Sequence, residues 1–106
     1  MPKTTTPAKI DKKRLYWLMN YYLKGEIDAW TFCNEFYECY DLKLDSKTLT
    51  NIEGKAFAAL SLIAGRFSNI EEDLRKYPGT YFTEDELKQK VLETKELLNE
   101  NNLFIE

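Results

Sequence analysis

Apolar residues recur at helical spacing along most of this chain, and no segment alternates apolar with polar residues over the length of a strand. The clearest pattern begins at Ala29 and repeats at i+3, i+4, i+7, i+8 and i+11, where it reaches Tyr40. Asp28 stands directly before this stripe and is suited to accept hydrogen bonds as an N-cap. Because such a stripe gives a helix one broad apolar face, the spacing predicts an all-α chain.

Three further helices are expected on the same grounds. The first is expected from the N-cap Asp11 to the terminating Gly25. The next runs from about Lys47 to Phe67, after a 41–46 loop that ends in the cap Ser46. The last runs from the N-cap Thr83 to about Asn99. Thr83 and Glu86 match the spacing of a capping box. Four helices with short connections predict an antiparallel four-helix bundle.

The 106 residues suffice for one domain and are too few for two. Residues 1–10 contain two prolines and three threonines without an apolar run, so they are expected to be a disordered leader. Residues 11–106 are then a single helical-bundle domain. Residues 69–76 either extend the third helix or form a separate short turn, because Pro78 and Gly79 end any helix there.

Charge is unevenly distributed along the chain. Residues 1–24 hold six basic residues and one acid, whereas residues 25–106 hold nine basic residues and seventeen acids. Because phosphate binding needs clustered lysine and arginine, the acidic body argues against nucleic acid as a partner. A rival interpretation gives that role to the basic residues near the start, which are Lys3, Lys9, Lys12, Lys13 and Arg14.

No membrane partner is expected. The longest apolar run, 56–64, is interrupted by Ser61. It falls far short of the roughly 20 residues that a bilayer-spanning helix needs. No apolar run typical of a signal peptide follows the first positive charges either. We therefore expect a soluble, cytoplasmic protein.

Neither catalysis nor a metal or cofactor is expected. The chain lacks histidine, the usual base for a serine or cysteine nucleophile, and it has no glycine-rich phosphate-binding loop. Cys33 and Cys39 are six residues apart, which on a helix is a rise of about 9 Å and too far for a disulfide. We expect both to be reduced, buried packing residues. Without histidine they supply only half of a zinc site.

The segment 69–87 combines acids and aromatic residues around the Pro78-Gly79 turn and is the expected binding surface. The acids at 84–86 fall in the first turn of a helix, where the dipole favours negative charge whatever the function. Those at 71–73 are expected near the end of the preceding helix, where the dipole disfavours them, so they point more strongly to a partner. The residues expected to bind are Glu71, Glu72, Asp73, Tyr77, Tyr81, Phe82, Glu84 and Asp85.

A second aromatic surface is expected on the first helix. Trp17 and Tyr21 are four residues apart, and Arg14 joins them on the side opposite Leu15 and Leu18. Either the leader or the apolar tail at 103–105 covers this surface, or it is a further contact surface or a dimer seam. These alternatives stay open at this point, and so does the oligomeric state.

Three short runs, in this order and spacing, resemble the colicin D immunity protein family, which includes immunity proteins of contact-dependent growth inhibition systems. The runs are GEIDA at 25–29 followed by Phe32 and Phe36, EDLR at 72–75, and YFTEDEL at 81–87 followed by Val91. The resemblance covers about residues 11–99. It implies a small four-helix bundle. The basic leader and the apolar tail at 103–105 depart from the family pattern.

The resemblance also implies a function. Family members are cytoplasmic antidotes that bind the C-terminal nuclease domain of a bacterial toxin, typically a tRNase. In the family the acidic end of the third helix and the loop beyond it approach the toxin's basic active site, which corresponds to Glu71, Glu72 and Asp73 here. Clustered carboxylates suit such a cleft, because it is built to hold phosphates. The alternative is a non-enzymatic helical adaptor or regulator that binds another protein.

Overall fold

The computed structural model describes residues 12–77 and 79–103, and the all-α prediction is confirmed. Over these residues the α-helices are α1 (Lys13–Leu23), α2 (Ala29–Phe36), α3 (Asn51–Ala64), α4 (Glu71–Lys76) and α5 (Glu84–Glu100). A π-helix, Tyr37–Lys43, continues α2, and a short 3₁₀ helix, Ser46–Thr48, precedes α3. The expected leader and the expected cap Asp11 lie outside the described residues.

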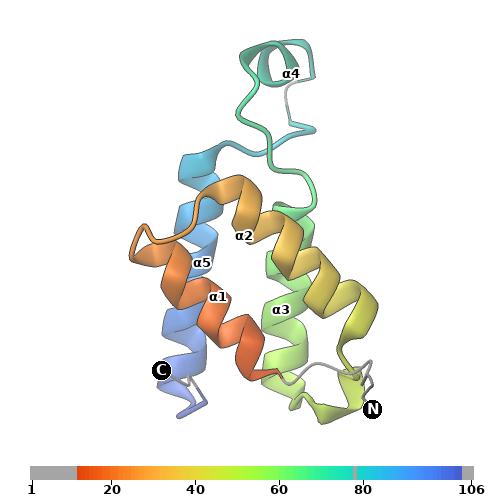
Figure 1. Ribbon diagram of the computed structural model, residues 1–106, viewed down its shortest axis with the longest axis vertical. Coiled ribbons are helices and arrows are strands. Elements are labelled where there is room, and N and C mark those ends of the chain that lie inside the picture. The colour runs from red at the N-terminus through yellow and green to blue at the C-terminus, as the bar shows by residue number, and fades with distance from the viewer. Residues whose placement is uncertain (1–11, 78, 104–106) are drawn as a thin grey trace, which may run out of the picture.

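The helices enclose one core and leave α4 outside it. α3 and α5 lie side by side and run in opposite directions, while α1 and α2 cross over them (Figure 1). α1 packs on α2 and α5, and α2 packs on α3. α4 stands beyond one end of these four helices (Figure 1). Of the segment that the sequence singled out for binding, 69–87, the part that includes α4 therefore projects from the core, whereas Leu87 at its end is buried in the core.

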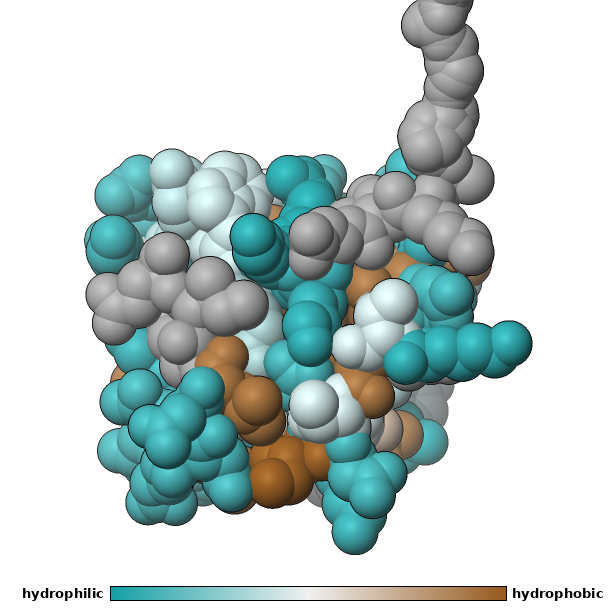
Figure 2. All heavy atoms as spheres, turned by 90° about the horizontal axis from the view of Figure 1, so that it is seen from below, coloured by the Kyte–Doolittle hydropathy of each residue, from teal (hydrophilic) through white to brown (hydrophobic). Residues whose placement is uncertain are grey.

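The opposite end of the molecule has a mixed surface. Seen from that end, the described residues form a small apolar group among hydrophilic ones rather than a broad apolar patch (Figure 2).

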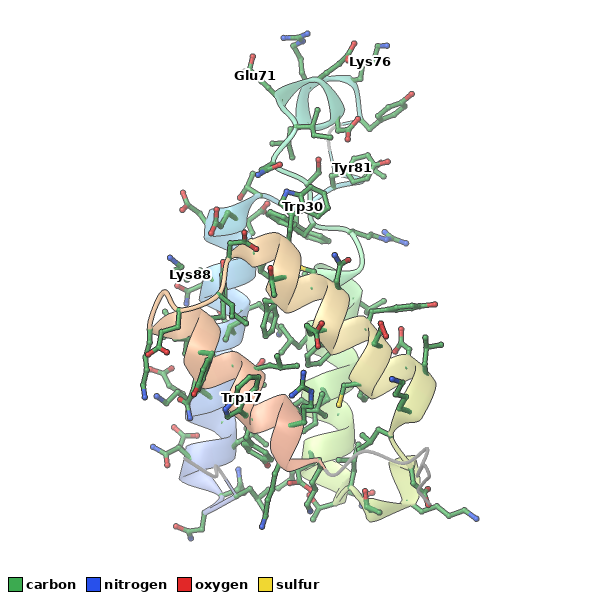
Figure 3. The ribbon with its side chains drawn as sticks, in the orientation of Figure 1. Trp17, Trp30, Glu71, Lys76, Tyr81 and Lys88 are labelled. Atoms are coloured by element: carbon green, nitrogen blue, oxygen red, sulfur yellow. The ribbon has the colours of Figure 1, made fainter. Side chains whose placement is uncertain are left out.

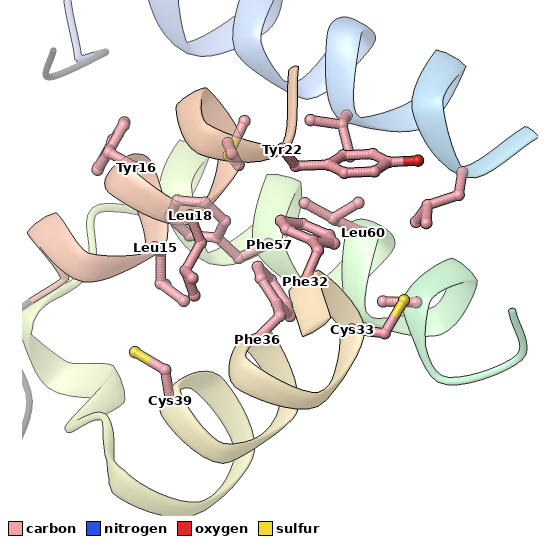
Figure 4. Packing of buried hydrophobic residues seen from close by; sticks show 14 of the residues in the cluster. Leu15, Tyr16, Leu18, Tyr22, Phe32, Cys33, Phe36, Cys39, Phe57 and Leu60 are labelled. Atoms are coloured by element: carbon pink, nitrogen blue, oxygen red, sulfur yellow. The ribbon is translucent and has the colours of Figure 1, made fainter. Parts of the chain in front are cut away.

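Aromatic rings from α1, α2 and α3 form the centre of the core (Figure 4). Phe32 stacks on Tyr22 with ring centroids 5.0 Å apart, and Phe57 meets Tyr16 edge-on at 5.6 Å. Such pairs contribute about 0.5–1.5 kcal/mol each beyond their buried area. Phe57 is fully buried. α5 contributes four buried residues: Leu87, Val91, Thr94 and Leu98.

Local capping signals fix several helix ends as predicted. The Asp28 carboxylate accepts from the Thr31 N–H at 2.8 Å at the start of α2. Thr83 and Glu86 form the expected capping box at the start of α5. Gly25 has φ +79°, a left-handed conformation that suits glycine, and it follows the last turn of α1. These three ends are confirmed.

The segment between α2 and α3 differs from the prediction. The expected 41–46 loop is partly helical, because the π-helix runs to Lys43 and the Leu44 N–H donates to the Cys39 carbonyl at 2.7 Å. The wider π turns rotate the apolar face, so Cys39 is buried while Tyr37 is 53% exposed. α3 starts four residues later than expected, since Thr50 rather than Ser46 caps it in a box with Glu53.

Among the described residues, Glu53 is the charged residue that is buried, and the sequence pattern did not predict its burial. Its side chain is 1% exposed. Its carboxylate accepts from the Thr50 N–H at 2.9 Å, the Tyr16 hydroxyl at 2.5 Å and the Lys12 ammonium at 2.9 Å. Lys12 also donates to the Thr48 carbonyl at 3.2 Å. This network joins the start of α1 to the start of α3.

Candidate binding site on the α4 arm

Residues 68–77 and 79–82 form a projection that we call the α4 arm. Its two ends meet where Phe67 pairs with Phe82 in a parallel backbone bridge. The Phe82 N–H donates to the Arg66 carbonyl at 2.7 Å, and the Ser68 N–H donates to the Phe82 carbonyl at 2.9 Å. These bonds close the base of the arm beside the core.

Trp30 of α2 supports the same base. Its indole N–H donates to the Asn69 side-chain oxygen at 3.2 Å, and its ring packs edge-on against Phe67 at 5.2 Å. Figure 3 shows Trp30 directly below the arm, with Glu71 and Lys76 at the far tip. Trp30 has no local sequence signal for this role, because its contacts are to residues more than 35 positions away along the chain.

The tip of the arm is the short helix α4, none of whose residues is buried. Glu71 pairs with Arg75 and Glu72 pairs with Lys76, each at 3.6 Å and each largely exposed. Such exposed pairs add little to stability. They do, however, offset part of the negative charge of the first turn.

The expected position of the first acidic group was wrong. Residues 71–73 lie in the first turn of a separate helix and not at the end of α3, which stops at Ala64. The dipole therefore favours these acids, and it also favours the basic residues Arg75 and Lys76 in the last turn. Of the two alternatives left open for 69–76, the separate short element is the one observed. Helix formation alone accounts for both acidic groups.

Two of the acids expected to bind a partner make hydrogen bonds within the protein itself. Asp73 accepts from the hydroxyl of Ser68 at 3.2 Å, and that buried hydroxyl accepts in turn from the Ile70 N–H at 3.1 Å. Glu84 accepts from the Tyr22 hydroxyl at 3.2 Å. Burial and the Glu84 charge both raise the pKa of Tyr22, so this hydroxyl stays a donor at neutral pH. Glu71, Glu72, Glu84 and Asp85 are exposed, and Asp73 is partly buried.

The three expected aromatic residues differ in exposure. Tyr77 is 52% exposed, so its ring is open to a partner in the free protein. Tyr81 is partly buried and meets Tyr77 edge-on, with ring centroids 6.2 Å apart. Phe82 is also partly buried and belongs to the base of the arm. Gly79, with φ +84°, makes the turn between Tyr77 and Tyr81.

A surface hollow between α3 and α5 adjoins the base of the arm, and we call it the α3–α5 hollow. Its larger part, about 460 Å³, is lined by Leu62, Ile63, Phe82 and Lys90 among others, and a part of about 330 Å³ extends to Asp85. Leu62 is 66% exposed. The structure thus brings Phe82 and Asp85 together here, whereas Glu71 lies at the tip of the arm (Figure 3).

The two cysteines are free and buried, as expected. Burial, followed by the nearby Glu84 charge, raises the pKa of Cys33 to about 12, and burial also raises the pKa of Cys39. We therefore expect both thiols to react with a thiol reagent at mildly alkaline pH at least about tenfold more slowly than in the urea-unfolded chain. A colorimetric thiol assay measures this, and fast reaction of either native thiol contradicts it.

No cluster of three or more potential metal-ligating side chains occurs among residues 12–77 and 79–103. Within that same part of the chain, none of the helices combines the length and apolar character required to cross a membrane. Comparison of the chain with known protein families, curated protein sequences and solved structures found no match.

Proposed function

We propose that this protein is an immunity protein of the bacterial cytoplasm. It binds the C-terminal nuclease domain of a cognate toxin, expected to be a tRNase, and blocks its basic active site. The observation that carries the proposal is the α4 arm, an exposed helix with an acidic first turn and the open ring of Tyr77. The proposal includes the antiparallel four-helix bundle of its family, formed by α1, α2, α3 and α5.

Electrostatic attraction supplies the first part of the mechanism. From 69 to 87 the chain has six acidic and two basic residues. A tRNase cleft holds phosphates with lysine and arginine, so an acidic arm speeds the encounter through long-range attraction. Because Arg75 pairs with Glu71 and Lys76 pairs with Glu72 on the same helix, charge alone gives the arm modest affinity.

Shape and apolar contact supply the rest. A stable interface usually buries about 800 Å² on each partner, which is more than a helix of six residues offers. The α3–α5 hollow extends the surface at the base of the arm, where the exposed Leu62 side chain and Phe82 can receive an apolar side chain of the toxin. Tyr77 at the arm is then an aromatic anchor of the kind that carries most binding energy.

Growth rescue tests the proposal directly. The C-terminal domain encoded by the gene immediately upstream is expressed in bacteria with and without this protein, and rescue of growth together with binding of the purified domains is expected. A domain from an unrelated toxin serves as the control and is not neutralised. Absence of both rescue and binding contradicts the proposal.

One observation favours the alternative, a helical adaptor or regulator that binds another protein. The α3–α5 hollow is apolar at Leu62 and Ile63, and it suits the apolar face of a partner helix without any basic cleft. An adaptor of this kind does not restore growth to cells that express a toxin. Growth rescue therefore separates the two functions.

A charge reversal tests the role of the arm. We expect the double variant Glu71→Lys/Glu72→Lys to weaken toxin binding about tenfold at low salt, mainly through slower association, and less at high salt. The matched control is Glu96→Lys/Glu100→Lys, an equal charge change on exposed residues at the other end of α5. Equal losses in the two variants show that net charge, and not the arm, matters.

A further inference from the structure

α1 lines a surface groove beside Trp17. Trp17 lies far from the tip of the α4 arm (Figure 3). The volume of the groove is about 480 Å³, within the usual range for sites that bind small molecules. Residues on successive turns of α1 form most of it, and α5 contributes one residue. The lining residues of this α1 groove are Lys13, Arg14, Trp17, Asn20, Tyr21, Lys24 and Lys95.

One wall of the α1 groove is aromatic and preorganised. The rings of Trp17 and Tyr21 lie 4.1 Å apart at an interplanar angle of 32°, and Trp17 is 41% exposed. The Arg14 guanidinium lies 4.9 Å from the centre of the Trp17 ring, and Glu35 of α2 holds it at 2.8 Å. Because these side chains already hold one another in place, they lose little conformational freedom when a flat ligand binds.

The rest of the α1 groove is positively charged. Four of its seven lining residues are lysine or arginine, and none is acidic. Lys95 of α5 reaches across and donates to the Asn20 side-chain oxygen at 3.5 Å. This concentration of positive charge contrasts with residues 25–106 as a whole, where acids outnumber basic residues. The groove therefore gathers positive charge on a chain whose formal net charge is −3.

We propose that the α1 groove binds a nucleotide, that is, a planar base attached to a phosphate. The base lies against the aromatic wall of Trp17 and Tyr21, and the phosphate lies among the ammonium groups of Lys13, Lys24 and Lys95. A mononucleotide matches both the volume and the mixture of an apolar wall with cationic ends.

Tryptophan fluorescence gives a clean test, because the chain has only two tryptophans. In a Trp30→Phe variant, Trp17 is the sole reporter and lies in the groove. We expect ATP to quench it saturably, with at least about tenfold weaker binding of adenosine and of inorganic triphosphate, since each lacks one of the two contacts. In the reverse variant, Trp17→Phe, the Trp30 signal at the base of the arm is expected to stay constant.

Charge variants locate the phosphate site. Lys24→Gln and Lys95→Gln are each expected to weaken ATP binding about tenfold. Lys55→Gln, an exposed lysine of α3 outside the groove, is the matched control and leaves binding unchanged. Calorimetry measures ATP binding to the unsubstituted protein. It therefore decides whether ATP binds even if one of the variants folds poorly.

Four outcomes overturn the inference. The first is no saturable binding of ATP by either method. The second is tighter binding of a single-stranded RNA oligomer, and the third is tighter binding of an acidic peptide, because each assigns the groove to a macromolecule. The fourth is quenching that follows self-association at rising protein concentration. None of these outcomes bears on growth rescue, so the inference and the proposed function fail separately.

Discussion

Replacing Glu53 with alanine is expected to lower the free energy of unfolding by about 3 kcal/mol. The substitution removes the common acceptor of three donors, and it leaves the hydroxyl of Tyr16, a fully buried residue, without this partner. Lys12 is 27% exposed and can turn towards water, which keeps the loss near the lower limit for a broken buried pair. Urea denaturation followed by circular dichroism measures the change.

Glu86→Ala is the matched control for Glu53→Ala. Both glutamates occupy the same position of a capping box, but Glu86 is exposed and Glu53 is buried. The control removes the bonds from the Thr83 N–H and hydroxyl to the Glu86 carboxylate and keeps the Thr83 cap, so it is expected to cost about 1 kcal/mol. Equal losses in the two variants contradict a role for the buried network.

The same network makes stability depend on pH. Burial alone raises the pKa of Glu53, but hydrogen bonds from Thr50, Tyr16 and Lys12 outweigh it and hold the pKa below its ordinary value of 4.5. A carboxyl whose pKa is lower in the folded state stabilises the protein above its unfolded pKa, and it loses this contribution as the pH falls through the folded value. We therefore expect a fall in pH to destabilise the native protein more than it destabilises the Glu53→Gln variant.

The helix ends that the sequence predicted correctly depend on neighbouring residues. The cap at Asp28 and the box of Thr83 with Glu86 lie within a single turn, so the sequence contains the whole signal. The start of α3 was missed although Thr50 and Glu53 have the same spacing as that box. The π-helix after α2 has no comparable local signal, because packing of Cys39 into the core selects it.

The candidate site was harder to predict because it depends on distant contacts. α3 ends early where Phe67 turns to pair with Phe82, and this pairing moves the acids of 71–73 onto a separate helix. The spacing of apolar residues within one helix carries no information about a pairing between two distant segments. The exposure of Leu62 had one signal, since the run 56–64 is apolar on nearly every face and no helix on a surface buries all of its faces.

Truncation of Tyr77 to alanine is expected to weaken toxin binding by at least about 2 kcal/mol, or about 30-fold, because a desolvated aromatic anchor concentrates binding energy. The melting temperature is expected to change little, since the ring is 52% exposed and lies outside the core. Binding is measured by calorimetry with the nuclease domain that growth rescue identifies.

Tyr37→Ala is the matched control for Tyr77→Ala, because Tyr37 is a tyrosine of nearly equal exposure, 53%, on the π-helix rather than on the α4 arm. It should leave binding unchanged. If Tyr77→Ala instead lowers the melting temperature strongly while the folded variant binds normally, Tyr77 supports the arm and does not contact the toxin. The interface then lies elsewhere, and the Arg14, Trp17 and Tyr21 surface of α1 is the next one to substitute, because its aromatic pair is already exposed and ordered.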